Sequence, residues 1–190
     1  MKKRIVAVVL LVALALVGGS CAKIKNKLKM PKTSDGNPTA ETHFTFVLND
    51  DETGYIIARK EKDVLPAIVN IPSEYNGKPV TAIAKEGFLN IETISTLNIP
   101  ATVQVIGDYA FKGCKNLGTV NFGVNKTVED GKYKESQHIG AFAFDGCSLL
   151  STVDASCVKT IGAHAFRGCK SSLKINNLVS DAVVSENYKD

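Results

Sequence analysis

The sequence contains none of the short motifs that usually carry catalysis. There is no nucleophile elbow, no glycine-rich phosphate loop and no pair of histidines at metal-binding spacing. The three histidines, His43, His138 and His164, stand in unrelated local sequences, and no spacing singles out two acidic residues for general acid–base work. The five cysteines never form a CxxC pair, which argues against a zinc site. We therefore expect a protein that is not an enzyme and uses neither cofactor nor metal.

Acidic residues are missing from the first part of the chain. Residues 1–32 contain eight of the 23 Lys and Arg residues and no Asp or Glu, which leaves 15 basic against 19 acidic residues in 33–190. The formal charge of +4 therefore conceals a mildly acidic body. Binding to nucleic acid requires a broad basic surface, so we expect no nucleic-acid partner.

No apolar run in the sequence is long enough to span a bilayer comfortably. The longest covers the 13 residues 5–17 and follows the basic residues 2–4, which is typical of an export signal. Small residues at 18–20 precede Cys21, and this arrangement resembles a bacterial lipobox, whose cysteine is acylated and becomes the new N-terminus. We expect residues 1–21 to be a lipoprotein signal peptide with lipidation at Cys21. An ordinary secretory signal is the alternative, because the usual lipobox leucine is a glycine here.

Residues 22–42 are predicted to form a flexible tether. They lack a hydrophobic period long enough for a stable element and are rich in Pro, Gly, Ser and Thr towards their end. Ala22 stands where an aspartate would retain a Gram-negative lipoprotein in the inner membrane, so we expect an exported protein, lipid-anchored on the outer membrane or cell surface. The lysines of the tether either attract anionic head groups or belong to a solvated spacer.

Residues 43–64 are predicted to form a β-hairpin that caps the N-terminal end of the fold. Residues typical of strands at His43–Leu48 and Tyr55–Ala58 flank the turn-forming segment Asn49–Gly54. The turn is acidic, but it lacks the 12-residue loop and distal glutamate of an EF-hand calcium site. A plain hairpin turn is therefore the favoured interpretation.

Residues 65–177 repeat one pattern, Ile-Gly-x-x-Ala-Phe-x-Gly-Cys-x-x-Leu-x-x-Val, with varying fidelity. Its phenylalanine stands at positions 88, 111, 144 and 166, at steps of 23, 33 and 22 residues. One such unit is too small to bury its own apolar face, so this period predicts a solenoid. Each coil should contain a short extended piece at Ile-Gly, one helical turn at Ala-Phe, and a strand after Leu. The Gly after the Phe, replaced by Asn90 in the first copy, should end that turn in the left-handed conformation.

Apolar anchors are expected to stack from coil to coil in columns. The phenylalanines form one column, and a second contains Ile83, Ile106, Ile139 and Ile161. A further repeat position is filled by Ile91, Cys114, Cys147 and Cys169. A position that accepts either Ile or Cys is a small apolar slot, so we expect three reduced, buried thiols rather than disulfides. Cys157 lies outside the repeat and has no predicted role.

Two segments depart from the repeat. The long step leaves an insertion at 123–137, in which Asp130-Gly131 predicts the turn of a charged β-hairpin that projects from the solenoid. This hairpin is either a recognition element or a tolerated loop. Residues 178–190 either cap the last coil or remain loose, and in the second case the last strand presents an edge that can pair with another copy. The oligomeric state is not predicted.

The repeat signature, with Ile-Pro between units and Asn-Gly-Lys-Pro-Val at 76–80, resembles the BspA-type leucine-rich repeat over 65–177. The resemblance implies an α+β repeat fold, a right-handed solenoid with short strands and short helical turns. It also implies a non-catalytic surface module for adhesion or protein binding. Similar proteins are common on bacteria of the Bacteroides group, and some are reported to bind host matrix proteins.

The outward positions of the repeat strands are the predicted ligand-binding surface. They form two columns on one sheet face, namely Asn98, Asn121, Asp154 and Asn176, and beside them Thr96, Thr119, Thr152 and Lys174. The alternative is that these side chains only hydrogen-bond to one another along the column. None is aromatic, which weighs against a sugar-stacking site.

We predict an envelope-anchored module for protein interaction or adhesion that binds a protein partner or a host or cell-surface ligand. Its candidate contacts are the Asn/Asp column, Thr119 and Thr152, together with Tyr133 of the insertion. The alternative is a glycan-binding or scaffold lipoprotein of an outer-membrane uptake complex.

Overall fold

The computed structural model of the chain describes residues 39–123, 128–129, 132–133, 137–155, 157–178 and 182–190. The predicted signal peptide, Cys21 and the tether up to residue 38 lie outside these ranges. Within the described residues, no helix has the length and apolar character needed to cross a membrane. A three-residue 3-10 helix, η1 (Glu41–His43), leads into the first strand.

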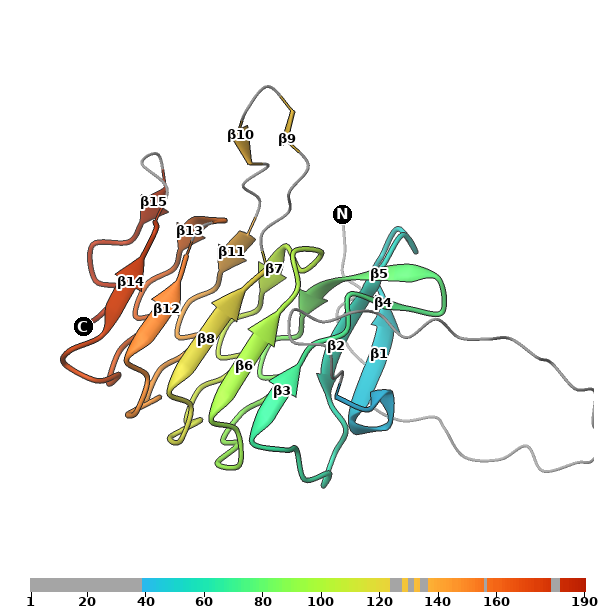
Figure 1. Cartoon of the computed structure of the whole chain (residues 1–190), viewed down its shortest axis with the longest axis horizontal. Helices are drawn as coiled ribbons and strands as arrows, with labels where there is room; N and C mark the ends of the chain where they lie inside the picture. The colour runs from blue at the N-terminus through green and yellow to red at the C-terminus, as the bar shows by residue number, and fades with distance from the viewer. Residues whose placement is uncertain (1–38, 124–127, 130–131, 134–136, 156, 179–181) are drawn as a thin grey trace, which may run out of the picture.

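Two sheets run along the whole folded part of the chain (Figure 1). Sheet A has the strand order β1 (Phe44–Leu48), β2 (Tyr55–Arg59), β5 (Lys78–Ile83), β7 (Val105–Ile106), β11 (Gln137–Ile139), β13 (Val158–Ile161) and β15 (Val183–Val184). Sheet B has the order β3 (Ile68–Asn70), β6 (Thr96–Ile99), β8 (Thr119–Phe122), β12 (Thr152–Asp154) and β14 (Lys174–Asn176). All pairs in both sheets are parallel except β1 with β2 and the short β4 (Glu74–Tyr75) with β5.

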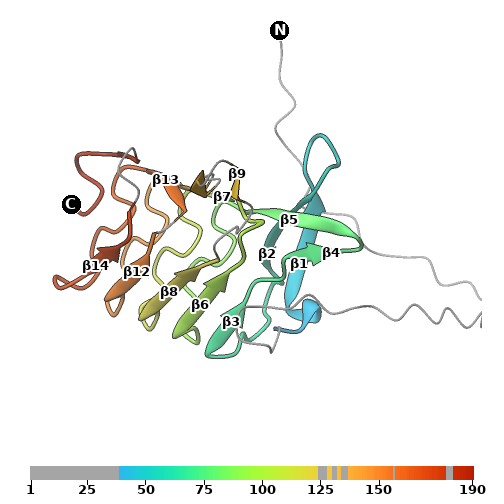
Figure 2. The same cartoon turned by 45° about the horizontal axis from the view of Figure 1, so that its top comes forward.

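Each coil passes once through both sheets, which confirms the predicted repeat solenoid. The Ile-Gly piece of a coil forms its strand in sheet A, and the segment after Leu forms its strand in sheet B (Figure 2). Repeat positions face each other in exact register: Leu97 lies opposite Val120, and Val120 opposite Val153. Parallel strands thereby receive the crossover connections that they require.

The predicted helical turn at Ala-Phe is wrong, because the described residues at this position form consecutive β-turns instead. In the second coil, N–H groups bond to carbonyls three residues back, as Ala110 does to Gly107 and Cys114 to Phe111. Other N–H groups point along the solenoid, so that Phe111 donates to Ala143 at 2.7 Å. Hydrogen bonding to the next coil satisfies donors that an isolated helical turn leaves unpaired.

Each double turn places two residues in the left-handed region. The predicted site is confirmed, with φ of +74°, +75° and +66° at Gly113, Gly146 and Gly168, and +56° at Asn90. A second site, four residues earlier, was not predicted because it carries no glycine. It is occupied by Glu86, Tyr109, Phe142 and His164, with φ between +54° and +59°.

The core is a continuous column of stacked rings. Ring centroids lie 5.0, 5.3 and 5.4 Å apart along Phe88, Phe111, Phe144 and Phe166, and each of these side chains is at most 1% exposed. The isoleucine column is also buried and in register between the strands of sheet A. The stacking predicted from the repeat is therefore confirmed.

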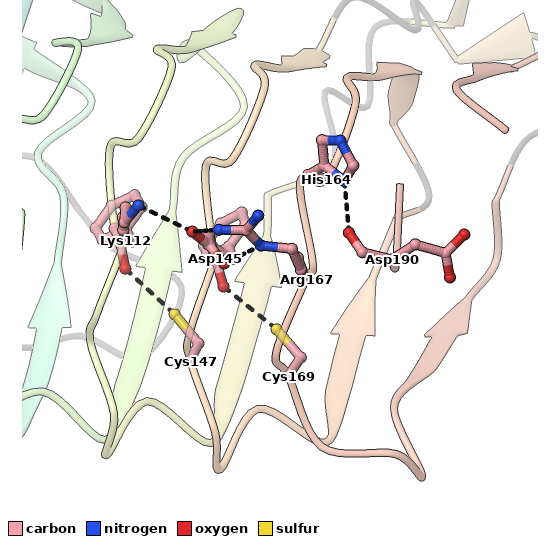
Figure 3. Close-up of polar contacts among 9 residues, drawn as sticks. Lys112, Asp145, Cys147, His164, Arg167, Cys169 and Asp190 are labelled. Atoms are coloured by element: carbon pink, nitrogen blue, oxygen red, sulfur yellow. Dashed lines mark hydrogen bonds and ion pairs between the residues drawn. The ribbon is translucent and has the colours of Figure 1, made fainter. Parts of the chain in front are cut away.

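The repeat cysteines are free thiols, as predicted. Cys114 and Cys147 are buried and Cys169 is partly buried. Each thiol donates to the carbonyl of the preceding coil's phenylalanine, at 3.1 to 3.3 Å. Figure 3 shows this contact for Cys147 and Cys169. Burial raises the pKa of Cys114 and of Cys169 to about 12, and it raises that of Cys147 still further. The Cys157 side chain is also buried.

The N-terminal end of sheet A is formed by the antiparallel pair β1 and β2, with Phe44 opposite Arg59 and Leu48 opposite Tyr55. Phe44 continues the ring column, edge-on to Phe88 at 6.1 Å. The acidic turn between the strands is closed by its own side chains, since Asn49 Oδ1 accepts from the Gly54 N–H and Asp51 Oδ1 accepts from Thr53.

The C-terminal residues 182–190 add a partial coil. Strand β15 pairs with β13, and the carbonyl of Tyr188 accepts a hydrogen bond from the Phe166 N–H at 2.8 Å. The Tyr188 ring lies edge-on to Phe166 at 6.4 Å, so rings cover both ends of the phenylalanine column. Sheet B ends at β14, whose outer edge is unpaired among the described residues.

The insertion contains the antiparallel strands β9 (Val128–Glu129) and β10 (Lys132–Tyr133), which stand away from the body of the solenoid (Figure 1). The predicted turn residues Asp130 and Gly131 lie outside the described residues. Strand β11 returns the chain to sheet A, where the buried Gln137 donates its side-chain amide to the Val103 carbonyl at 3.1 Å.

Candidate interaction surfaces

The outward face of sheet B carries the two predicted columns in register. Asn70, Asn98, Asn121, Asp154 and Asn176 follow one another on adjacent strands, which adds Asn70 to the column predicted from the sequence. The threonine column lies beside it, with Thr119 paired to Thr152 and Thr152 to Lys174. Parallel pairing without a slip explains this order, because a one-residue shift would turn every side chain to the other face.

The N-terminal half of the Asn/Asp column forms a hydrogen-bonded ladder. Asn121 donates its side-chain amide to Asn98 Oδ1 at 2.8 Å, and Asn98 donates to Asn70 Oδ1 at 2.6 Å. Thr39 lies at the end, where its hydroxyl oxygen accepts the Asn70 N–H at 2.8 Å. Asn98 is only 7% exposed, so its amide serves the ladder rather than a ligand. The alternative of ladder hydrogen bonding therefore describes this half.

The C-terminal half of the column is open to solvent. Asn121 and Asn176 are exposed and Asp154 is partly buried, while Thr119 and Thr152 are partly buried beside them. Asn177 donates to Asp154 Oδ1 at 3.2 Å. Among the candidate contacts of sheet B, Asn98 is therefore enclosed in the ladder, whereas Asn121, Asp154, Asn176, Thr119 and Thr152 are at least partly exposed. The side chain of Tyr133 lies outside the described residues.

The double turns form a second surface, between the strands of sheet A and sheet B in each coil. At the unpredicted left-handed site, Tyr109 stacks on Phe142 with centroids 5.0 Å apart, and Phe142 stacks on His164 at 4.8 Å. All three are partly exposed. The repeat alignment already placed them at one position, but it could not show that their rings stack at the surface.

A buried carboxylate lies beside these rings. Asp145 accepts two hydrogen bonds from the Arg167 guanidinium, at 3.0 and 2.9 Å, and forms an ion pair with Lys112 at 3.1 Å (Figure 3). The Asp145 side chain is 8% exposed, whereas those of Lys112 and Arg167 are 40% and 47% exposed. Burial by itself raises the pKa of Asp145, but the hydrogen bonds and charges of Arg167 and Lys112 outweigh it, so its pKa lies below the ordinary value.

The three histidines have separate local partners. His43 Nδ1 lies 3.2 Å from Asp63 Oδ2, and His138 Nδ1 lies 2.8 Å from the Thr160 hydroxyl. His164 contacts the backbone carbonyl of Asp190. Among the described residues, no group of three or more His, Cys, Asp or Glu side chains is placed to hold a metal ion.

The repeats match a known family. The BspA-type leucine-rich repeat region matches residues 81–176 in six copies. The chain belongs to this family. Among curated proteins, none matches the chain.

Solved structures of bacterial leucine-rich repeat proteins are similar in fold to this chain. A leucine-rich repeat protein of T. pallidum, TpLRR, is 26% identical, with a TM-score of 0.63 over 81% of this chain and 67% of its own. A leucine-rich repeat protein of Bacteroides ovatus is 23% identical, with a TM-score of 0.53 over 76% of this chain and 36% of its own. This chain thus spans about two thirds of the first protein and about a third of the second. Leucine-rich repeats generally mediate protein interactions, and this class of function agrees with the extended polar surfaces described above.

Proposed function

We propose that the protein is a non-catalytic, envelope-anchored module that binds a protein partner through the open half of the sheet B face. The observation that carries the proposal is the division of the Asn/Asp column. Asn70 and Asn98 are buried in the ladder, which ends at Asn121. Asn121, Asp154 and Asn176 remain accessible towards the other end of the column.

The proposed surface is extended and polar, and it is held rigidly by the parallel strands beneath it. Its donors and acceptors repeat at the spacing of neighbouring strands, roughly 4.8 Å. A protein surface with complementary polar groups can therefore bond to several coils at once. Thr119 and Thr152 add two hydroxyl groups beside the column, and the insertion stands near the same strands because it follows β8 directly.

Binding to immobilised proteins tests this function. The full chain in nonionic detergent is applied to a panel of purified extracellular-matrix proteins and, in parallel, to a glycan array. We expect saturable binding to at least one protein, weakened about tenfold in the double variant Asn121→Ala/Asp154→Asn, as for loss of a hot spot. A matched control, Thr45→Ser on the exposed side of β1, should bind as the wild type does.

Two outcomes would contradict the proposal. Binding to glycans without binding to proteins would favour the glycan-uptake alternative. Equal binding of the double variant and the wild type would place the contact elsewhere on the molecule.

Envelope anchoring through Cys21 is a separate part of the proposal. It is supported by the sequence of residues 2–20, in which basic residues are followed by an apolar run and then by small residues. Two or more acyl chains on the cysteine would provide stable membrane attachment. In cells fed an alkyne fatty acid, the chain should become labelled, and Cys21→Ser should abolish the label. A label that persists in Cys21→Ser would overturn lipidation at this residue.

A further inference from the structure

The surface of the double turns carries a feature that the repeat fold does not require. We use the term aromatic–cation strip for the rings of Tyr109, Phe142 and His164 with the basic side chains of Lys112 and Arg167. Lys112 Nζ lies 5.4 Å from the Tyr109 ring centroid and 6.0 Å from that of Phe142. The guanidinium carbon of Arg167 lies 5.1 Å from the Phe142 centroid.

The rings of the strip stand on unfavourable backbone. Tyr109, Phe142 and His164 have φ of +59°, +56° and +54°. The left-handed region costs a bulky residue about 1–2 kcal/mol, and Gly or Asn would occupy it at lower cost. Glu86 adopts the same conformation in the first coil, so the turn forms without a ring. Ring stacking offsets part of this strain, and strain retained in three successive coils points to a function for the exposed rings.

The strip has one positive charge more than its own carboxylate neutralises. Lys112 Nζ and Arg167 Nη2 lie 3.1 and 2.9 Å from the same oxygen, Asp145 Oδ2, so they are at most 6.0 Å apart. Asp145 is buried beneath them and has both cations as partners. Two further carboxylates belong to these turns. Asp108 accepts the Ala141 N–H at 2.8 Å, and Glu86 occupies the ring position of the first coil, where its neighbour Lys85 has its Nζ 5.8 Å from the Tyr109 ring centroid. Two half-exposed cations thus share one buried anion on a body that is otherwise mildly acidic.

Ring orientation makes the strip electropositive as well. The rings stack face to face along the solenoid, with 5° between Tyr109 and Phe142 and 29° between Phe142 and His164. Stacking covers the electron-rich faces between the rings, and the positive ring edges are left to contact solvent. A sugar that needs an open ring face has none between the stacked pairs, whereas a carboxylate would find ring edges and spare N–H donors together.

We propose that the aromatic–cation strip is the docking site of an acidic segment of a protein partner, which lies across the coils and brings a carboxylate to Lys112 and Arg167. Tyr and Arg are enriched where partners bind most strongly, and a second anion would balance the second cation. The inference goes beyond the proposed function because it concerns the turn surface and not sheet B.

A random dodecapeptide library displayed on phage tests the inference. The full chain in nonionic detergent is the bait, and selected peptides are synthesised and measured by fluorescence anisotropy. Two single substitutions each remove one side chain of the strip with little disturbance of the turn that carries it. Phe142→Asn replaces the ring by a residue that accepts positive φ, and Lys112→Gln leaves a donor for Asp145. The control is Asn121→Ala/Asp154→Asn, which changes sheet B alone.

We expect selected peptides with an excess of Asp and Glu whose affinity falls with added salt. Each strip variant should weaken their binding by about fivefold or more, and the sheet B control should leave it unchanged. Peptides without acidic excess, or equal binding by wild type and strip variants, would overturn the inference. So would binding of heparin at the strip without any acidic peptide, since it would mark a polysaccharide surface.

A gain-of-binding variant provides an independent arm. Glu86 occupies the ring position in the coil next to Tyr109, with φ of +57°. Glu86→Tyr should extend the strip by one ring and tighten binding of the acidic peptides about threefold, beyond the effect of Glu86→Gln, which removes the charge alone. Equal affinity in these two variants would show that charge, and not the row of rings, governs binding and would contradict the proposed role of the rings.

Discussion

The guanidinium of Arg167 holds the carboxylate of Asp145 by two hydrogen bonds, at 3.0 and 2.9 Å, across 22 residues of sequence but only one coil of the solenoid. A bidentate pair of this kind fixes both side chains in one orientation. Asp145 thereby ties its own coil to the next, and its ion pair with Lys112 ties it to the previous one. Three coils are therefore clipped together at the turn surface.

Removal of this clip should lower stability modestly. We expect Asp145→Asn to reduce the free energy of unfolding by about 1–2 kcal/mol, because both cations lose the buried carboxylate that they share. The loss is modest, since the two cations are half exposed and water screens their charges. Urea denaturation measures the change. Lys115→Gln serves as the control, since its pair with Glu92 at 3.1 Å is exposed on both sides and should matter little. An equal loss in both variants would contradict the clip.

The same carboxylate should make stability depend on pH. The pKa of Asp145 is lower in the folded state than in the unfolded chain, so its stabilising contribution is present above the unfolded value and is lost as pH falls through the folded value. The stability difference between wild type and Asp145→Asn should therefore be constant near neutrality and shrink below about pH 4. Urea denaturation of both proteins from pH 7 to pH 3 provides the comparison. If this stability difference grew on acidification, the pKa of Asp145 could not be lower in the folded state than in the unfolded chain.

Substitution of Phe144 should lower the stability far more than substitution of Phe142, although the two residues are only two positions apart. Phe144→Ala leaves a cavity in the ring column and should cost about 3–5 kcal/mol. Phe142→Asn should change stability by less than about 1 kcal/mol, because relief of the left-handed strain at φ +56° offsets lost stacking. Thermal and urea unfolding distinguish the two. A larger loss for Phe142→Asn than for Phe144→Ala would contradict the conclusion that Phe144 belongs to the buried ring column and Phe142 does not.

Substitutions in the Asn/Asp column should lower stability at Asn98, in the centre of the ladder, and have little effect at Asn176, outside the ladder. Asn98→Ala removes the acceptor of Asn121 and the donor to Asn70, and it leaves a buried Asn70 oxygen short of that donor, so we expect a cost of about 1–3 kcal/mol. The exposed Asn176→Ala should remain within about 0.5 kcal/mol of the wild type. Chemical denaturation of both variants measures this contrast. Equal stabilities of the two variants would contradict the prediction.

The repeat thiols should be unreactive in the folded protein. Burial raises the pKa of Cys114 and Cys169 to about 12, so at pH 8 very little thiolate is present to react. Iodoacetamide followed by peptide mass spectrometry should show these sites and Cys147 unmodified in buffer and fully modified in guanidinium chloride. Rapid alkylation of the native protein would indicate that the coils open more readily than their packing suggests.

The repeat spacing alone was sufficient to predict the solenoid, the phenylalanine column and the buried thiols. Each of these depends on a periodic contact between identical positions in successive coils, and periodicity is visible in a sequence. The left-handed glycines were predictable for the same reason, since Asn90 replaces Gly with a residue that tolerates the same conformation. The predicted helical turn was wrong because backbone hydrogen bonds between coils, as from Phe111 to Ala143, compete with those within a coil and leave no sequence mark.

Only the tertiary structure decided which polar residues are accessible. Asn98 and Asn121 occupy the same repeat position, yet one is enclosed within a ladder and the other is exposed, because Asn70 and Thr39 lie at one end of the column. Likewise, the residue after the repeat phenylalanine is Lys112, Asp145 and Arg167 in the last three coils. These charges interact only because stacking of the coils brings them within about 3 Å of one another. The repeat thus determined the fold through contacts that recur in every coil, whereas the surface depends on contacts between unlike neighbours, and these arise only once the coils are stacked.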